Sequence, residues 1–211
     1  MKLKDAIELI KDRIYVNAKP VRISLTKNKV AKRRFVKDKP REASKMSNVL
    51  SVPLRKCCTG VWDWPLYIWG PAGIGKTCAG LLTTDWVESS YYWTIDRLAA
   101  IFAEALCGRL FSTGPAQELL TWDDMVEKIS RADLVVLDEI GKGLRNGRAS
   151  DHQKRVLQAV LDSRERMATV LLGNYDVAEL SVIFDPYIAS RIQVGTLVSC
   201  AKMRDRRVAP E

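Results

Sequence analysis

The sequence has few of the residues that most often bind metals or act as nucleophiles. Its single histidine, His152, lies in a polar stretch, which favours an ordinary solvated helix start over a catalytic group. Its five cysteines are odd in number and nowhere show a C-x-x-C spacing. This excludes the usual cysteine patterns for zinc binding or dithiol redox chemistry, so we expect structural thiols.

Long hydrophobic runs are also missing. No segment approaches the roughly 20 consecutive apolar residues that span a bilayer, and the start, Met1 to Asp5, lacks the apolar stretch of a secretion signal. We therefore expect a cytoplasmic protein with no membrane partner. Its 211 residues and 47% hydrophobic content are sufficient for one sizeable domain plus an extension.

Acidic residues are scarce in only one part of the chain. Residues 1–50 contain 15 Lys or Arg against 5 Asp or Glu, whereas residues 51–211 contain 19 against 20. We therefore divide the chain into a basic N-terminal arm, 1–55, and a near-neutral domain, 56–211. A cationic arm favours contact with a polyanion, most simply nucleic acid, because phosphate neutralisation releases counterions. A solvated tail is the alternative.

The hydrophobic periodicity changes along the chain. Apolar residues between Leu3 and Ile14 recur at helical spacing and predict one short amphipathic helix, whereas residues 19–51 indicate an extended linker with a possible strand at 21–25. Beyond the linker, strands and helices alternate, which predicts an α/β fold with a parallel sheet covered on both faces. We expect strands at 66–69, 90–94, 134–137 and 168–172 and helices at 76–82, 95–107, 122–130 and 152–166.

A glycine-rich segment joins the first of these strands to a helix. It reads Gly70-Pro71-Ala72-Gly73-Ile74-Gly75-Lys76-Thr77 and matches the pattern G-x-x-x-x-G-K-[ST]. The glycines let backbone N–H groups curl around phosphate oxygens, and the helix N-terminus adds its positive end. Lys76 can reach the β- and γ-phosphates, and the Thr77 hydroxyl can ligate magnesium. We therefore expect this segment and the adjoining Cys78 to bind ATP with Mg²⁺.

Two carboxylates, Asp138 and Glu139, follow the continuous apolar run 134–137. Only a strand buried in a parallel sheet needs four apolar residues in a row, and its carboxyl end is where such sheets bind ligands. Asp138 can hold the magnesium shell, and Glu139 can orient and deprotonate the water that attacks the γ-phosphate. Together with the glycine-rich segment, the pair indicates ATP hydrolysis.

Another apolar strand, at 169–173, ends in Asn174. If this strand lies between the other two in the sheet, the Asn174 side chain reaches the γ-phosphate or the lytic water. The alternative is an Asn that makes the turn before Asp176.

Together these residues resemble the DnaC-type helicase loaders, a branch of the AAA+ ATPases, with the IstB-type transposition helpers as close cousins. The resemblance covers about residues 60–207. It lies in Gly70 to Thr77, in Asp138-Glu139-Ile140-Gly141, in the strand ending in Asn174, and in Ser190-Arg191-Ile192 followed by Gly195 and an Arg-rich end.

The resemblance implies an AAA+ P-loop fold with a five-stranded parallel sheet. It implies Asn174 as a polar sensor, Arg191 as an arginine finger acting on ATP held by a neighbouring subunit of an oligomer, and Arg206 or Arg207 as a second sensor arginine. An arginine near the γ-phosphate offsets the charge that develops during transfer. Alternatively, Arg191 pairs with a surface carboxylate such as Asp185.

The resemblance implies that the chain acts in DNA replication. We expect an ATPase that binds single-stranded DNA and loads a hexameric replicative helicase. Because the arm has no cysteine-histidine cluster, the contact with the helicase would depend on the helix at 3–14. The alternatives are an IstB-type transposition helper, a small-molecule P-loop kinase, and a binding module in which ATP only locks a bound state.

Residues 141–148 are glycine-rich and cationic, and they directly follow the two carboxylates. A flexible loop there could sense single-stranded DNA and report it to the ATP site. A solvated loop without a ligand is the alternative. The Trp and Tyr residues at 62–69 and 91–93 are expected in the core rather than as platforms on which bases stack.

Overall fold

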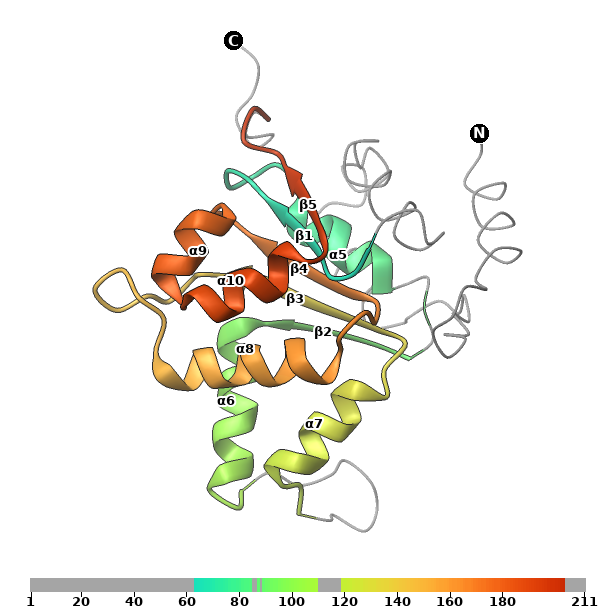
Figure 1. The fold of residues 1–211 in the computed structure, drawn as a ribbon. Coiled ribbons are helices and arrows are strands. Elements are labelled where there is room, and N and C mark those ends of the chain that lie inside the picture. The colour runs from blue at the N-terminus through green and yellow to red at the C-terminus, as the bar shows by residue number, and fades with distance from the viewer. Residues whose placement is uncertain (1–62, 85–86, 88, 110–118, 204–211) are drawn as a thin grey trace.

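The computed structural model describes residues 63–84, 87, 89–109 and 119–203 (Figure 1). The basic arm, its expected helix and strand, and the pair Arg206 and Arg207 lie outside the described residues. Within those ranges, none of the helices has both the length and the apolar character that crossing a membrane requires.

A five-stranded parallel sheet forms the centre of the domain. Its order is β2-β3-β4-β1-β5, so the strand before the glycine-rich segment has neighbours on both sides. The strands are β1 (Leu66–Trp69), β2 (Ser90–Thr94), β3 (Leu134–Ile140), β4 (Thr169–Gly173) and β5 (Thr196–Ser199). Strands β1 to β4 lie where the apolar runs predicted strands. The sequence pattern did not locate β5, because this edge strand is short and alternates between half-buried and exposed residues.

Six helices connect the described strands. They are α5 (Lys76–Thr84), α6 (Ile95–Leu106), α7 (Trp122–Ser130), α8 (Asp151–Ser163), α9 (Val177–Ile183) and α10 (Pro186–Gln193). Side chains of Thr94, Thr121, Ser150, Asp176 and Asp185 cap the N-termini of the last five. Periodicity did not predict α9 and α10, because helices of seven and eight residues hold too few turns to show a repeat.

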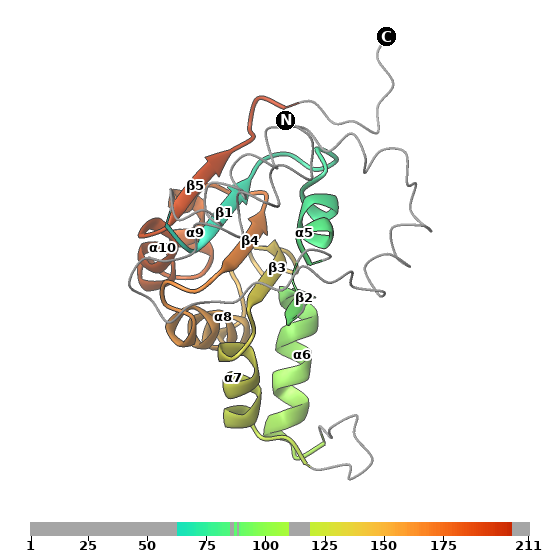
Figure 2. The same cartoon turned by 90° about the vertical axis from the view of Figure 1, so that its right-hand side faces the viewer.

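Alternate residues of the central strands face two separate apolar layers. Leu66, Ile68 and Val136 pack with residues of α5 on one face, whereas Tyr67 and Val135 pack with residues of the other helices on the opposite face. Figure 2 shows the sheet between α5 on one side and α8, α9 and α10 on the other. Burial on both faces explains the unbroken apolar runs.

Helix α5 packs directly against the sheet at Gly80. A Cβ atom at this position would lie 2.8 Å from Leu172 Cδ1 and 2.9 Å from Val136 Cγ1. Contacts this short force neighbouring side chains to shift, so the missing side chain sets the depth of α5. The position of the glycine-rich segment, which leads into α5, follows from this packing.

A buried arginine joins the helical layer to the sheet at the edge where β3 and β4 begin. The side chain of Arg164 donates to the carbonyl oxygens of Ile129 (2.7 Å), Ala132 (2.8 Å) and Ala168 (2.7 Å) and to the Thr169 hydroxyl (3.0 Å). Burial lowers the pKa of Arg164 to about 10, so the guanidinium stays charged at neutral pH. Its hydrogen bonds tie the end of α7 to the start of β4.

Candidate nucleotide-binding site

The glycine-rich segment leaves β1 and curls into α5 through backbone angles that favour glycine. The φ angles are 79° at Gly73 and 99° at Gly75. Gly70 is needed for a different reason, since a Cβ atom there would lie 2.8 Å from the carbonyl carbon of Cys200. The loop is thus confined between the end of β5 and the start of α5.

Lys76 occupies the inside of this curve. It is 7% exposed, and its Nζ donates to the carbonyl oxygens of Gly70 (2.7 Å) and Pro71 (2.8 Å). The first turn of α5 contains no acidic residue. A buried cation beside helix N-terminal N–H groups suits a polyphosphate.

The P-loop and the end of β3 meet at the carboxylate of Asp138, which is 3% exposed. Thr77 Oγ1 donates to Asp138 Oδ2 at 2.5 Å, and the Tyr92 hydroxyl donates to the same oxygen at 2.7 Å. The backbone N–H of Glu139 donates to Asp138 Oδ1 at 2.6 Å. Hydroxyl and carboxylate oxygens are the ligands that Mg²⁺ prefers, so Thr77 and Asp138 fit the predicted metal site.

Glu139 lies next to this cluster in a backbone conformation that is rare for its residue type. Its φ is 60°, and the pairing of β3 with β4 shifts register between Leu137 and Ile140. Bulges of this kind re-aim side chains near active sites. The Glu139 carboxylate accepts a hydrogen bond from Lys142 Nζ at 2.5 Å, and this bond raises the pKa of Lys142.

The predicted order of the strands around Asn174 is confirmed. β4 lies between β1 and β3, and its last residue, Gly173, pairs with Trp69 and with Ile140. Gly70 N also donates to the Gly173 carbonyl at 3.3 Å. Asn174 is exposed at this edge, between the P-loop and the two carboxylates. A contact between its side chain and phosphate or water stays a prediction.

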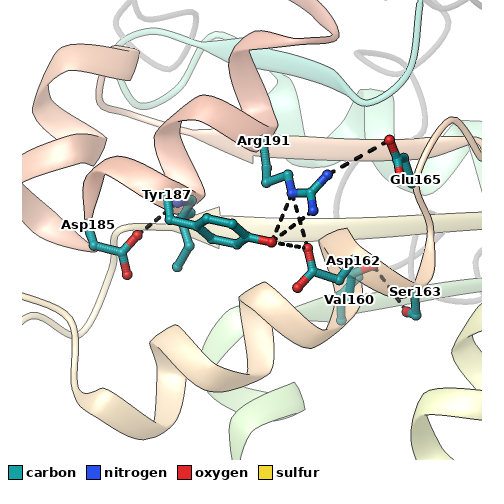
Figure 3. A network of polar contacts seen from close by, with 8 residues as sticks. Val160, Asp162, Ser163, Glu165, Asp185, Tyr187 and Arg191 are labelled. Atoms are coloured by element: carbon teal, nitrogen blue, oxygen red, sulfur yellow. Dashed lines mark hydrogen bonds and ion pairs between the residues drawn. The ribbon is translucent and has the colours of Figure 1, made fainter.

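Arg191 lies on α10 and belongs to a polar network on the surface (Figure 3). Its Nε and Nη2 donate to the Tyr187 hydroxyl at 3.0 and 2.9 Å, and its guanidinium pairs with Asp162 (3.2 Å) and Glu165 (3.8 Å). The Tyr187 hydroxyl in turn donates to Asp162 at 2.8 Å. Arg191 thus pairs with surface carboxylates, as the alternative expected, but with Asp162 and Glu165 rather than with Asp185, whose carboxylate caps α10.

Arg191 lies toward the end of the sheet where the parallel strands begin, whereas the P-loop lies where they end. α10 leads into the start of β5, whereas the P-loop follows the end of β1, and the two strands are parallel. The structure therefore does not bring Arg191 to the P-loop of its own chain. An arginine finger at this position could act only on another copy.

The sequence pattern did not indicate the contacts of two side chains near the site. Tyr92 was expected in the core, but its hydroxyl reaches Asp138, and Lys142 was not expected to pair with Glu139. The contact of Tyr92 depends on the β2–β3 register, in which Tyr92 lies opposite Val136 and Thr94 opposite Asp138, and the sequence does not show this register. His152 begins a helix as expected, but it is half-buried rather than solvated, and its Nε2 lies 2.7 Å from the Ala99 carbonyl oxygen.

Solved structures of replication proteins share this architecture. A DNA replication initiation factor has a TM-score of 0.57 at 18% identity over 75% of this chain and 46% of its own. The replication initiator DnaA bound to AMPPCP and single-stranded DNA has a TM-score of 0.55 at 18% identity over 72% of this chain and 44% of its own. The present chain thus spans less than half the length of both.

A DnaC helicase loader matches over 82% of this chain and 92% of its own, at 14% identity, but its TM-score of 0.48 is too low to support an argument. Neither protein-family models nor curated proteins match the sequence. The likeness to the initiation factor and to DnaA, together with the five-stranded parallel sheet, shows the P-loop AAA+ fold and confirms the expected fold class.

Proposed function

We propose that this chain is an ATP-hydrolysing AAA+ protein that acts in DNA replication. The contact between Thr77 Oγ1 and Asp138 Oδ2 carries the proposal, because it joins the P-loop to the end of β3. Two oxygen ligands thereby meet beside a buried lysine and a helix N-terminus with no acidic residue in its first turn. This combination suits a nucleoside triphosphate with a divalent cation.

Binding would depend on groups of the P-loop. The N–H groups at 73–77 would donate to phosphate oxygens, and Lys76 would exchange its carbonyl partners for the β- and γ-phosphates. Thr77 and Asp138 would hold Mg²⁺, which neutralises charge on the phosphates when bound. Burial of Lys76 strengthens its attraction to phosphate, because the local dielectric constant is lower than that of water.

Hydrolysis would use Glu139 as the general base. Its carboxylate takes a proton from water, the water oxygen bonds to the γ-phosphorus, and the bond from that phosphorus to the β–γ bridging oxygen breaks. The products are ADP and inorganic phosphate. Asn174, exposed at the same edge, would orient the water or the γ-phosphate.

The chain would load a hexameric replicative helicase onto single-stranded DNA, and it would assemble with copies of itself. The opposite placement of Arg191 and the P-loop supports the assembly, since an arginine finger at that edge needs a second subunit. The AAA+ fold shared with replication initiators supports the process.

Phosphate release from ATP tests the enzymatic part. We expect turnover with Mg²⁺ that rises when single-stranded DNA is added. Lys76→Ala should abolish binding of a fluorescent ATP analogue, whereas Glu139→Gln should retain binding and reduce turnover by about 100-fold or more. Glu127→Gln is the matched control, because Glu127 pairs with Arg131 on the exposed face of α7. Binding without turnover under all conditions would contradict hydrolysis.

Capture of a purified hexameric replicative helicase tests the loading part. We expect the full chain to retain the helicase in the presence of ATP, and deletion of residues 1–18 to prevent retention. Retention of a transposase instead of the helicase would favour the IstB-type alternative.

A further inference from the structure

The connection between β3 and α8 contains a small, fixed hairpin, which projects from the body of the domain (Figure 1). Arg145 N donates to the Arg148 carbonyl at 2.9 Å, and Arg148 N donates to the Arg145 carbonyl at 3.0 Å. The intervening Asn146 and Gly147 have φ angles of 51° and 74°, as in the I′ turn that Asn-Gly sequences favour. The backbone here is thus held by hydrogen bonds, unlike the flexible loop expected from the sequence.

This hairpin places Arg145 and Arg148 directly opposite each other. Arg145 and Arg148 exchange both backbone hydrogen bonds, so their Cα atoms lie about 5.5 Å apart and their side chains share one face. Both residues are exposed, and neither forms an ion pair with the residues that the structure describes. Like charges directly opposite each other repel, so an anion between them would relieve this repulsion.

We propose that Arg145 and Arg148 form a clamp for the phosphate backbone of a nucleic acid strand. Guanidinium groups bind phosphate with two parallel hydrogen bonds each, which makes a pair of them a strong phosphate site. Residues 141–149 contain no aromatic side chain on which a base could stack. The clamp therefore contacts the backbone and has no sequence preference.

The clamp lies next to the nucleotide site along the chain. Only Ile140 and the segment 141–144 separate Glu139 from the hairpin, and Lys142 in that segment bonds to the Glu139 carboxylate. A strand held by the hairpin is therefore linked through a short stretch of backbone to the residue proposed as general base. The inference rests on the proposed function for the class of partner, since a replication protein meets nucleic acid.

Binding of labelled oligothymidylate to the full chain, followed by fluorescence anisotropy over a range of salt concentrations, tests the clamp. The double variant Arg145→Gln/Arg148→Gln should weaken binding about tenfold and reduce the slope of log K against log salt by about 0.7 for each phosphate that it no longer neutralises. Arg131→Gln/Arg166→Gln is the matched control. Both of its exposed positions precede β3 and β4, at the opposite edge of the sheet.

A second pair of variants tests the hairpin geometry without changing charge. A β-branched residue is strained at the φ of 74°, whereas Asn tolerates it. Gly147→Val should weaken DNA binding, and Gly147→Asn should preserve it. Equal binding by these two variants, or equal weakening by the clamp and control double variants, would overturn the proposal. Competition by polyglutamate as effective as that by DNA would also overturn it, because a carboxylate surface would then be the ligand.

The outcomes separate the clamp from the ATPase. If the wild-type protein releases no phosphate from ATP, but DNA affinity falls in the clamp variants and not in the control, the result would contradict the ATPase and support the clamp. Wild-type protein that hydrolyses ATP, while the clamp variants bind DNA unchanged, would refute the clamp alone.

Discussion

At the scale of single residues, one oxygen of Asp138 accepts two hydroxyl donors that come from different elements. Thr77 on α5 is a P-loop residue, whereas Tyr92 lies on β2, away from the loop. Groups that hydrogen-bond to a metal ligand fix its orientation and tune its affinity for the metal. Under the proposed function, Tyr92 would therefore position Asp138 and would not itself bind the metal.

Removal of the Tyr92 hydroxyl should weaken the magnesium site. We expect Tyr92→Phe to raise the Mg²⁺ concentration needed for half-maximal ATP turnover by about tenfold, because Asp138 loses one of its orienting donors. Magnesium titrations of turnover measure this effect. Tyr91→Phe is the control, since the Tyr91 ring stacks on Trp93 and packs with the helical layer on the other face of β2. Identical magnesium requirements in both variants would contradict the role of Tyr92.

The pair formed by Lys142 and Glu139 should restrain basal hydrolysis. The side chains of Lys142 and Glu139 are 63% and 33% exposed, so the attraction within the pair is worth only about 0.2–1 kcal/mol. Lys142→Met should therefore increase ATP turnover without DNA by up to about fivefold, because the Glu139 carboxylate becomes free to meet water. Lys154→Met, which breaks an equally spaced pair with Asp151, is the control in the same phosphate-release assay. A fall in turnover would show that Lys142 assists the reaction.

At the scale of elements, the sheet and the helical layer are joined by a polar group inside the core. Arg164 reaches three carbonyl oxygens, at Ile129, Ala132 and Ala168. Those of Ile129 and Ala168 also accept from backbone N–H groups, so the guanidinium adds a second donor there. Buried polar groups that lose their partners destabilise the folded state by about 1–3 kcal/mol each. The end of α7 is held beside the start of β4 by these shared hydrogen bonds.

Loss of this arginine should destabilise the whole domain. We expect Arg164→Met to lower the free energy of unfolding by about 2–4 kcal/mol, because four buried acceptors lose a charged donor at once. Denaturant unfolding measures the loss. Arg131→Met, which breaks only the exposed pair with Glu127, should cost less than about 1 kcal/mol. Equal stability of the two variants would mean that other donors or water replace Arg164.

At the scale of the whole molecule, the proposed nucleotide site and the proposed arginine finger lie toward opposite ends of the parallel strands. The P-loop, Asp138 and Asn174 gather where the strands end, whereas Arg191 lies near the start of β5. Head-to-tail contact between copies brings such opposite edges together, and it generates rings or filaments. The network of Arg191 with Tyr187, Asp162 and Glu165 would have to open for the guanidinium to reach a neighbour.

A mixing experiment tests whether Arg191 acts between copies. Lys76→Ala and Arg191→Ala should each reduce turnover strongly when assayed alone. An equimolar mixture should recover part of the activity, because the intact Arg191 of one variant can act on the intact P-loop of the other. Turnover per chain at increasing protein concentration is the measurement. No recovery in mixtures that assemble normally would contradict action between copies.

The sequence by itself predicted the candidate phosphate site and determined most of the sheet. The P-loop residues, the Asp138-Glu139 pair and four strands lie within short segments, and the local pattern of such segments decides their structure. The edge strand β5 and the short helices α9 and α10 were missed, since their positions depend on packing rather than on a repeat.

Only the tertiary structure decided which distant groups meet. The Thr77–Asp138 and Tyr92–Asp138 contacts span 61 and 46 residues, and they depend on the register of β2 with β3 and on the depth of α5 against the sheet. The register of strands and the close approach of a helix arise from long-range packing, which leaves no local pattern. The same reason explains why only the structure shows Arg191 at the edge opposite the P-loop.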